Sequence, residues 1–414
     1  MSKPHRRSHR LWLYLAVMGP GIIAASAGND AGGIATYSSA GAAFGNSMLW
    51  LILVLMFILI VVQEMAARMG AVTHRGLSDL IRETFGVRWT TFAMLVLLVA
   101  NGNIVVAEFA GIAASTELLG ISRYISVPIM AAIAWLIVVK GSYVVAERIF
   151  LLFSAAFLAY PIAAYLAHPD WGEVLHATIV PRIQGNTAFL VMAITVVGTT
   201  VSPYMQFFLQ SSVVDKGIGV EEYRYERADV VSGVIFSILI AFFIMLSTAA
   251  TLYPRGITVD TAAQAAQALV PFAGPYAEVL FAVGLFGASM LAASVLPLST
   301  AYAVSEAFGW ERGVTRSFGE AKEFTALYTG LIVIGALVVL VPGLSLIGIM
   351  LTSQFLNGIL LPVILVFMLL LVNRRSLMGR YVNGPIYNLI AWATVVLVTL
   401  AIGVLLVMQI ISML

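Results

Sequence analysis

Charged residues, cysteine and histidine are all scarce in this chain of 414 residues. Only 10% of its residues are charged, 61% are hydrophobic, and the mean hydropathy is +1.00. A soluble globular protein carries roughly 45–50% apolar and about 25% charged residues, so the composition excludes one, and it equally excludes a disordered chain. We therefore expect an integral membrane protein.

The absences also exclude several kinds of chemistry. Without cysteine there are no disulfides, thiolate ligands or thiol nucleophiles. The five histidines fall in tails or expected loops, and no His-Glu-x-x-His motif is present. The 22 Lys and Arg nearly balance the 20 Asp and Glu, so no nucleic-acid partner is indicated. We expect neither an enzyme nor a bound cofactor.

Long hydrophobic runs divide the chain into eleven expected transmembrane helices. Each crossing needs about 20 residues, which leaves no room for a separate soluble domain. The lipid bilayer is thus the main partner, and the chain is expected to be a monomer. The runs cover residues 11–43, 47–70, 90–116, 124–140, 144–167, 186–213, 229–253, 274–306, 323–343, 345–372 and 385–412. They form one transmembrane domain over residues 1–414, with a tail at 1–10, a first repeat at 11–167, a second at 186–372 and an eleventh helix at 385–412.

The basic residues indicate the orientation of these helices. If the N-terminus is cytoplasmic, all Lys and Arg except Arg123, Arg182 and Arg255 lie on the cytoplasmic side, as the positive-inside rule requires. The basic segment 1–10 precedes an apolar run too long for a signal peptide, so it is expected to lead into the first span. An odd number of spans then places the C-terminus outside the cell.

Two of the expected helices are interrupted by helix breakers. The first span contains Gly19-Pro20-Gly21 and then residues 28–33 (GNDAGG), and the sixth contains residues 198–204 (GTTVSPY). A broken backbone at membrane depth is tolerated only where protein buries it or it lines a cavity. Breaks five spans apart are typical of an all-α, LeuT-type inverted repeat of 5+5 helices, with helices 1 and 6 unwound at the midplane. The alternative, that Gly and Pro serve only helix packing, explains neither this separation nor the acid at Asp30.

Asp30 needs a partner, because an ionised Asp near the bilayer centre costs about 2.5–3.5 kcal/mol. Every Lys and Arg falls in a loop or at a helix end, so a cation is the better partner. All other candidate ligands near the breaks carry hard oxygens, which suit magnesium, calcium or manganese. These candidates are the backbone near Ala27 and Gly28, the hydroxyls of Thr199 and Ser202, and the amides of Gln354 and Asn357, three residues apart on one helical face.

Structural roles are open for the same groups. Asp30 could be a protonated structural acid, the amides of span ten could only join helices, and the hydroxyls of span six could only bond their own helix. Glu64 lies four residues before Arg68, a spacing that favours a helical ion pair. Glu108 could gate the outer pathway or balance a buried polar group, and residues 220–229 (VEEYRYERAD) are expected to be a solvated connector.

Several motifs together resemble the Nramp (natural resistance-associated macrophage protein) family of divalent-metal transporters. The resemblance covers roughly the first two thirds of the chain and part of span ten. Its motifs are Gly19-Pro20-Gly21, the Asp30 break, residues 40–45 (AGAAFG), 63–70 (QEMAARMG) and 77–85 (LSDLIRETF), Gln210-Ser211-Ser212, and Ser353-Gln354.

The chain departs from the family pattern at residues that handle the metal and the proton. Where the family has Asp-Pro-Gly-Asn, this chain has Asp30-Ala31-Gly32-Gly33. Gly33 replaces the asparagine ligand, so a metal would find more room there. Where the family has Met-Pro-His, this chain has Ser202-Pro203-Tyr204. The family's Asp-Leu-Ala-Glu reads VVAE at 105–108, and no Lys or Arg lies between Lys322 and Arg374.

These departures resemble the Nramp-related magnesium transporters, a prokaryotic branch without evident proton coupling. The resemblance implies uptake of partly hydrated Mg²⁺, and also Mn²⁺, by alternating access in a prokaryotic inner membrane. Loss of the Asn and Met side chains would also suit Mg²⁺ physically, because this ion keeps several waters and avoids soft ligands. The open alternatives are a proton-coupled Mn²⁺/Fe²⁺ transporter of the conventional Nramp type, an amino-acid transporter of the same fold, and a channel.

Overall fold

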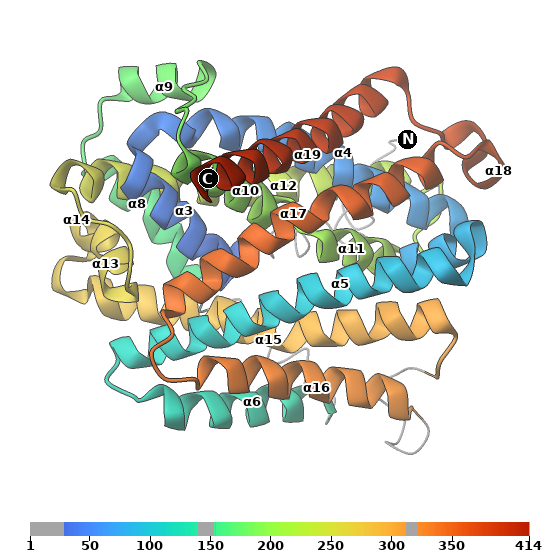
Figure 1. Cartoon of the computed structure of the whole chain (residues 1–414), viewed down its shortest axis with the longest axis horizontal. Coiled ribbons are helices and arrows are strands. Elements are labelled where there is room, and N and C mark those ends of the chain that lie inside the picture. Colours follow the sequence, from blue (N-terminus) through green and yellow to red (C-terminus); the bar gives the residue numbers. More distant parts are fainter. Residues whose placement is uncertain (1–28, 140–152, 154, 312–320, 414) are drawn as a thin grey trace, which may run out of the picture.

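The protein is a bundle of long helices arranged in layers. The computed structural model describes residues 29–139, 153, 155–311 and 321–413, and this part contains helices and loops but no strand. Helices α5 and α15 run side by side, with α6 and α16 packed beyond them (Figure 1). The long helices are α3 (Ala31–Phe44), α4 (Leu49–Thr73), α5 (Leu77–Leu118), α6 (Arg123–Val139), α10 (Thr187–Thr200), α11 (Pro203–Asp215), α12 (Tyr223–Thr251), α15 (Ala277–Phe308), α16 (Lys322–Val339), α17 (Leu346–Val372) and α19 (Pro385–Met413).

Eight helical stretches of the described residues are long and apolar enough to cross a membrane. The expected spans 47–70, 323–343 and 345–372 agree closely with α4, α16 and α17. Helix α6 and the segment Ala155–Leu166, which ends in α8 (Ala159–Leu166), are apolar but shorter. The all-helical membrane architecture is therefore confirmed, while the count of eleven spans stays a prediction.

The expected break in span six is confirmed. Helix α10 ends at Thr200, Val201 is non-helical (φ −120°, ψ 61°), and α11 begins at Pro203 after an extended Ser202. Proline suits the first position of a helix, because its missing N–H would have no partner there. For span one, α3 begins directly after Asp30, and Gly19-Pro20-Gly21 lies outside the described residues.

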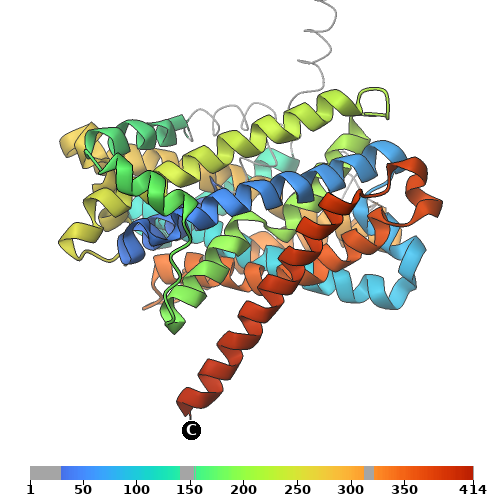
Figure 2. The ribbon, with the colours of Figure 1, turned by 90° about the horizontal axis from the view of Figure 1, so that it is seen from above.

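The short helices gather at the two ends of the bundle. Helices α9 (Trp171–Ile179), α13 (Ala262–Ala266) and α14 (Val270–Ala273) lie at one end, whereas α18 (Arg375–Met378) and the turn from α4 to α5 lie at the other (Figure 1). The first group lies in loops expected outside the cell and the second in loops expected in the cytoplasm. Helix α19 tilts away from the bundle, and the C-terminus projects from it (Figure 2).

Helix α5 is interrupted where the chain turns at Gly86 (φ 78°), so a short helix from Leu77 precedes the part that contains the expected span 90–116. One expectation about the connecting segments is wrong. Residues 220–229 are not a solvated connector, since α12 begins at Tyr223. Glu226 and Asp229, three residues apart, are both 0% exposed, whereas Arg224 and Arg227 on the other face of the helix are exposed. Helical periodicity thus sorts a run of mixed charge into a buried and an exposed face.

The expected ion pair within α4 is confirmed. Arg68 Nη2 lies 3.2 Å from Glu64 Oε2, and both residues are buried. Arg68 also donates to the Tyr381 carbonyl at 3.0 Å and to the Asn383 side chain. The guanidinium therefore ties α4 to the turn that leads into α19.

Candidate functional site

Asp30 lies at the N-terminus of α3 in the interior of the bundle. The residue is only 4% exposed, and its Oδ1 accepts a hydrogen bond from the Gly33 amide at 2.6 Å. This is the geometry of an N-cap, in which a carboxylate satisfies an amide that the helix leaves unpaired. Asp30 is therefore held in one position by its own helix.

Helix α17 brings two amide side chains to Asp30. Gln354 Nε2 lies 3.4 Å from Asp30 Oδ1, and Asn357 Nδ2 donates to Gln354 Oε1 at 3.1 Å. Both amides are 0% exposed. A Cβ atom added at Gly32 would overlap the Gln354 amide, so this side chain lies directly against the Gly32 backbone.

Helix α5 brings a second acid, Glu108, to the start of α3. Its Oε2 accepts a hydrogen bond at 3.3 Å from the amide of Ala31, the residue that follows Asp30. Glu108 is 0% exposed. The sequence singles out Glu108 as the one acid within the run 90–116, but it does not indicate the contact with Ala31.

The break between α10 and α11 packs against the same turn of α17. A Cβ atom at Gly198 would overlap the Gln354 carbonyl oxygen and the Gly358 nitrogen, so the two backbones are in close contact. The Ser202 hydroxyl donates to the Gly198 carbonyl at 2.8 Å, as the purely structural alternative expects. The Thr199 hydroxyl is buried and makes no hydrogen bond.

Four buried side-chain oxygens on the elements that meet at Asp30 make no hydrogen bond. Buried polar groups are nearly always paired, so each such group calls for a water, an ion or a functional explanation. Asn29, which sequence reasoning missed, donates to Ser237 Oγ at 3.0 Å while its own oxygen is unpaired. The four oxygens come from different parts of the bundle: Asn29 Oδ1, Glu108 Oε1, Thr199 Oγ1 and Asn357 Oδ1.

The ionisable side chains of this cluster are acids. Within the described residues, no Lys or Arg side chain bonds to Asp30; its hydrogen-bond partners are the Gly33 amide and Gln354. The described part also contains no group of three or more His, Cys, Asp or Glu residues that could hold a metal. The arrangement combines two carboxyls with neutral oxygens, and it can bind a cation through hard ligands only.

The predicted ligands fall into three groups. Asp30, Gln354 and Asn357 are connected by hydrogen bonds, and Thr199 and Ser202 flank the α10–α11 break beside them. Gly33 donates its amide N–H to Asp30. It would therefore help a cation to bind by leaving space beside Asp30, and not as a ligand. Ala27 and Gly28 lie outside the described residues. The ligand set as a whole stays a prediction.

Solved structures share this fold. A manganese transporter from Eremococcus coleocola, in complex with an aromatic bis-isothiourea substituted compound, superposes with a TM-score of 0.75 over 97% of this chain and 87% of its own, at 20% identity. MhsT in complex with L-phenylalanine gives a TM-score of 0.53 over 94% of this chain and 97% of its own, at 14% identity. The LeuT-type fold expected from the paired breaks is thereby confirmed.

Sequence comparison gives the family. The protein named divalent metal cation transporter MntH of Deinococcus radiodurans is 28% identical over 93% of this chain and 88% of its own length. The protein of the same name from Bacillus subtilis is 23% identical over 93% of this chain and 90% of its own. The family described as natural resistance-associated macrophage protein-like matches residues 21–409. The chain therefore belongs to the Nramp family, a family of transporters and not of enzymes.

Proposed function

We propose that this protein transports divalent metal cations across the membrane, with Asp30 as the charged ligand. The observation that carries the proposal is a carboxylate 4% exposed, without a Lys or Arg partner in the described residues, beside buried oxygens that make no hydrogen bond. A buried carboxylate is costly unless a cation compensates it, and the missing cation is most simply the cargo.

The names of the relatives support the same class of cargo. The curated relatives are called divalent metal cation transporters, and the neighbour from Eremococcus coleocola is called a manganese transporter. Mn²⁺ accepts carboxylate and carbonyl oxygens as readily as Mg²⁺ does. Mn²⁺ is therefore the second candidate substrate, and a conventional proton-coupled Mn²⁺/Fe²⁺ transporter is the second candidate function.

Mg²⁺ is the substrate that suits this chain's own residues best. Mg²⁺ dehydrates reluctantly and usually keeps several waters, so its site needs space and few direct ligands. Gly33 and Ser202 stand where the family pattern has Asn and Met, which removes two bulky side chains and the soft sulfur together. The oxygens of Asp30, Thr199, Gln354 and Asn357 could then bind the ion directly or through its waters.

We further propose that transport is uncoupled from protons. The residues that the family pattern offers for proton movement are replaced by Tyr204 and Val105, and α16 carries no Lys or Arg beyond Lys322 at its first position. A membrane potential can drive uptake alone, since two charges moved through about 100 mV gain about 4.6 kcal/mol.

Alternating access follows from the broken helices. The short extended segment at Val201 and Ser202 lets α10 and α11 change their angle, and the site lies beside it. Transporters of this architecture move one bundle against the other around a fixed site. We place the protein in a prokaryotic plasma membrane as a monomer, with the N-terminus cytoplasmic and the C-terminus outside.

The test is a flux assay in proteoliposomes that compares Mg²⁺, Mn²⁺ and Ca²⁺ while a dye reports internal pH. With potassium and valinomycin setting a negative interior, we expect Mg²⁺ and Mn²⁺ to enter without internal acidification. Acidification that tracks metal entry would exclude the uncoupled mechanism. Entry of Mn²⁺ but not Mg²⁺ would exclude the magnesium assignment, and absence of any metal flux would exclude the proposed function.

A further inference from the structure

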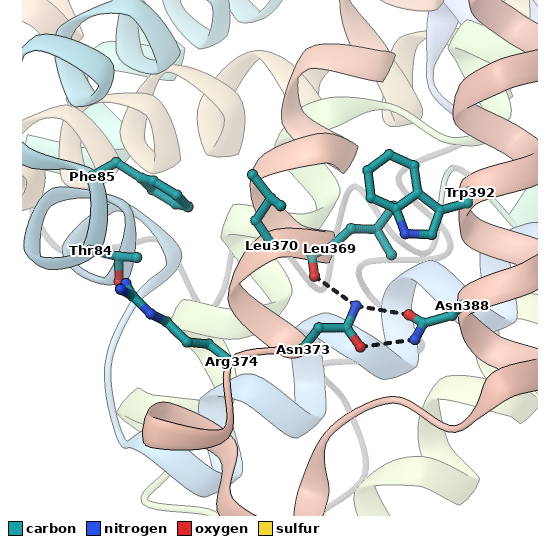
Figure 3. Close-up of a pocket in the computed structure, with 8 residues that line it drawn as sticks. All are labelled: Thr84, Phe85, Leu369, Leu370, Asn373, Arg374, Asn388 and Trp392. Atoms are coloured by element: carbon teal, nitrogen blue, oxygen red, sulfur yellow. Dashed lines mark hydrogen bonds between the residues drawn. The ribbon is translucent and has the colours of Figure 1, made fainter.

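A cavity of about 600 Å³ opens on the surface far from Asp30, at the end of the bundle that carries α18. It lies between α5, α17 and α19, where the chain leaves α17 and turns toward α19. Figure 3 shows side chains from all three helices converging on it. Thr84 and Phe85 come from α5, Leu369 and Leu370 from α17, and Trp392 from α19.

One wall of the cavity carries an arginine without a partner. Arg374 extends across the opening toward Thr84 (Figure 3). Its guanidinium makes no hydrogen bond or ion pair with any residue in the described part, and the residue is exposed. A guanidinium offers five N–H donors in a planar fork that matches a phosphate group.

Two neighbouring amides that line the cavity are bonded to each other. Asn373 and Asn388 exchange two hydrogen bonds of 2.8 and 2.9 Å, and Asn373 also donates to the Leu369 carbonyl at 2.8 Å (Figure 3). These bonds use both N–H groups of the Asn373 amide but only one of Asn388. No Asp or Glu lines the cavity, so its polar groups are suited to an anion.

The remaining walls are apolar and adjoin a surface of exposed hydrophobic residues. Leu370, Leu389 and Trp89 are 46%, 70% and 54% exposed, and the Trp89 ring packs on Phe367 of α17 with its centroid 6.5 Å away. In a membrane protein such a surface faces lipid, and tryptophans mark the level of the headgroups. The cavity therefore combines a basic group with apolar walls and adjoins a surface of the kind that faces lipid.

We propose that this cavity binds the phosphate headgroup of an anionic phospholipid. Arg374 binds the phosphate, Thr84 and Asn388 supply further hydrogen bonds, and the first part of an acyl chain lies along Phe85, Leu369 and Trp392. Basic pockets between helices on the cytoplasmic side bind anionic headgroups, and this end of the bundle is the one expected in the cytoplasm. The proposal does not depend on which ion the protein transports.

Native mass spectrometry of the whole protein in detergent tests this site. Phosphatidylglycerol and phosphatidylcholine are titrated separately against the protein and its variants. We expect the protein to prefer phosphatidylglycerol, and Arg374→Gln to weaken that binding about tenfold, the effect of losing one charge-assisted hydrogen bond. The matched control is Arg375→Gln, which removes the same charge one residue away, outside the cavity, and should change nothing.

A second variant keeps the test decisive if Arg374→Gln fails to fold. Thr84→Glu places a carboxylate opposite Arg374, where it pairs with the guanidinium and repels phosphate, and it should weaken phosphatidylglycerol binding at least as strongly. Equal binding of both lipids, or loss of binding in Arg375→Gln to the same extent as in Arg374→Gln, would overturn the proposal. So would complete displacement of the lipid by an equal concentration of inorganic phosphate, which would identify a soluble-anion site instead.

Discussion

The side-chain nitrogen of Gln354 lies 3.4 Å from Asp30 Oδ1, although 324 residues separate the two in the chain. The contact joins the helix of the first break to α17, and Asn357 extends it by a second hydrogen bond of 3.1 Å. Gly198 brings the second break onto the same turn of α17. One glutamine thus connects three of the elements that would surround a transported ion.

Replacement of Gln354 should weaken the site without unfolding the protein. In Gln354→Ala, Asp30 loses its amide partner and Asn357 loses an acceptor. We expect the apparent affinity for Mg²⁺ to fall roughly tenfold, as expected for one hydrogen bond to a charged group. Concentration-dependent uptake in proteoliposomes measures this. Gln184→Ala, in the loop before α10, is the control, and the same apparent affinity in both variants would contradict the role given to Gln354.

A methyl group at Gly32 should act through the same glutamine. Gly32→Ala places a Cβ atom where the Gln354 amide now lies, so the amide must move away from Asp30. We expect uptake to fall several-fold while expression and melting temperature change little, because the displaced group is the end of a flexible side chain. Gly330→Ala on α16 is the matched control, since a Cβ atom there meets nothing within 4 Å. Equal uptake by the two variants would show that the amide position is unimportant.

Glu108 should matter for stability through the Ala31 amide. Glu108→Ala leaves this buried N–H without its acceptor, which costs about 1–3 kcal/mol. Glu108→Gln keeps an acceptor oxygen and should unfold close to the temperature of the unaltered protein. Thermal unfolding in detergent, followed by tryptophan fluorescence, distinguishes the two variants. A melting temperature for Glu108→Ala as high as that for Glu108→Gln would exclude this capping role.

Metal selectivity should follow the two residues that depart from the family pattern. The double variant Gly33→Asn, Ser202→Met restores an amide and a thioether near Asp30. Thioethers favour softer metals, so we expect affinity for Mn²⁺ and Cd²⁺ to rise relative to Mg²⁺. Isothermal titration calorimetry with each metal gives the ratio. Because Ser202 also bonds the Gly198 carbonyl, the single variant Ser202→Ala separates loss of that bond from gain of sulfur. An unchanged metal profile in the double variant would refute the ligand assignment.

Local signals predicted the helices and the break in span six well. Apolar runs give the bounds of α4, α16 and α17 to within four residues, and Pro203 marks the start of α11 because proline is favoured where a helix needs no N–H. Such signals depend on a few neighbouring residues. They failed at Glu226 and Asp229, whose charges indicated solvent exposure.

The sequence indicated Asp30 and the two amides of α17 as site residues, but it did not indicate the contacts that join the elements of the site. Asp30 could be identified because no basic residue is available at its depth, and Gln354 with Asn357 because helical spacing places them on one face. Nothing in the sequence indicates that Glu108 accepts from Ala31, or that Gly32 rather than Gly33 lies against Gln354. These contacts depend on how α3, α5 and α17 pack, and packing over such chain separations leaves no local pattern.

The charge of Asp30 is the centre of the account, and one measurement tests it most directly. Asp30→Asn keeps the size and the capping oxygen of the side chain but removes its charge. In proteoliposomes with an internal magnesium dye and a fixed negative potential, we predict that Asp30→Asn abolishes Mg²⁺ uptake. Asp260→Asn, at an exposed acid in the loop between α12 and α13, should transport at the unaltered rate. Uptake by Asp30→Asn equal to that of Asp260→Asn would contradict the assignment of Asp30 as the ligand of the transported cation.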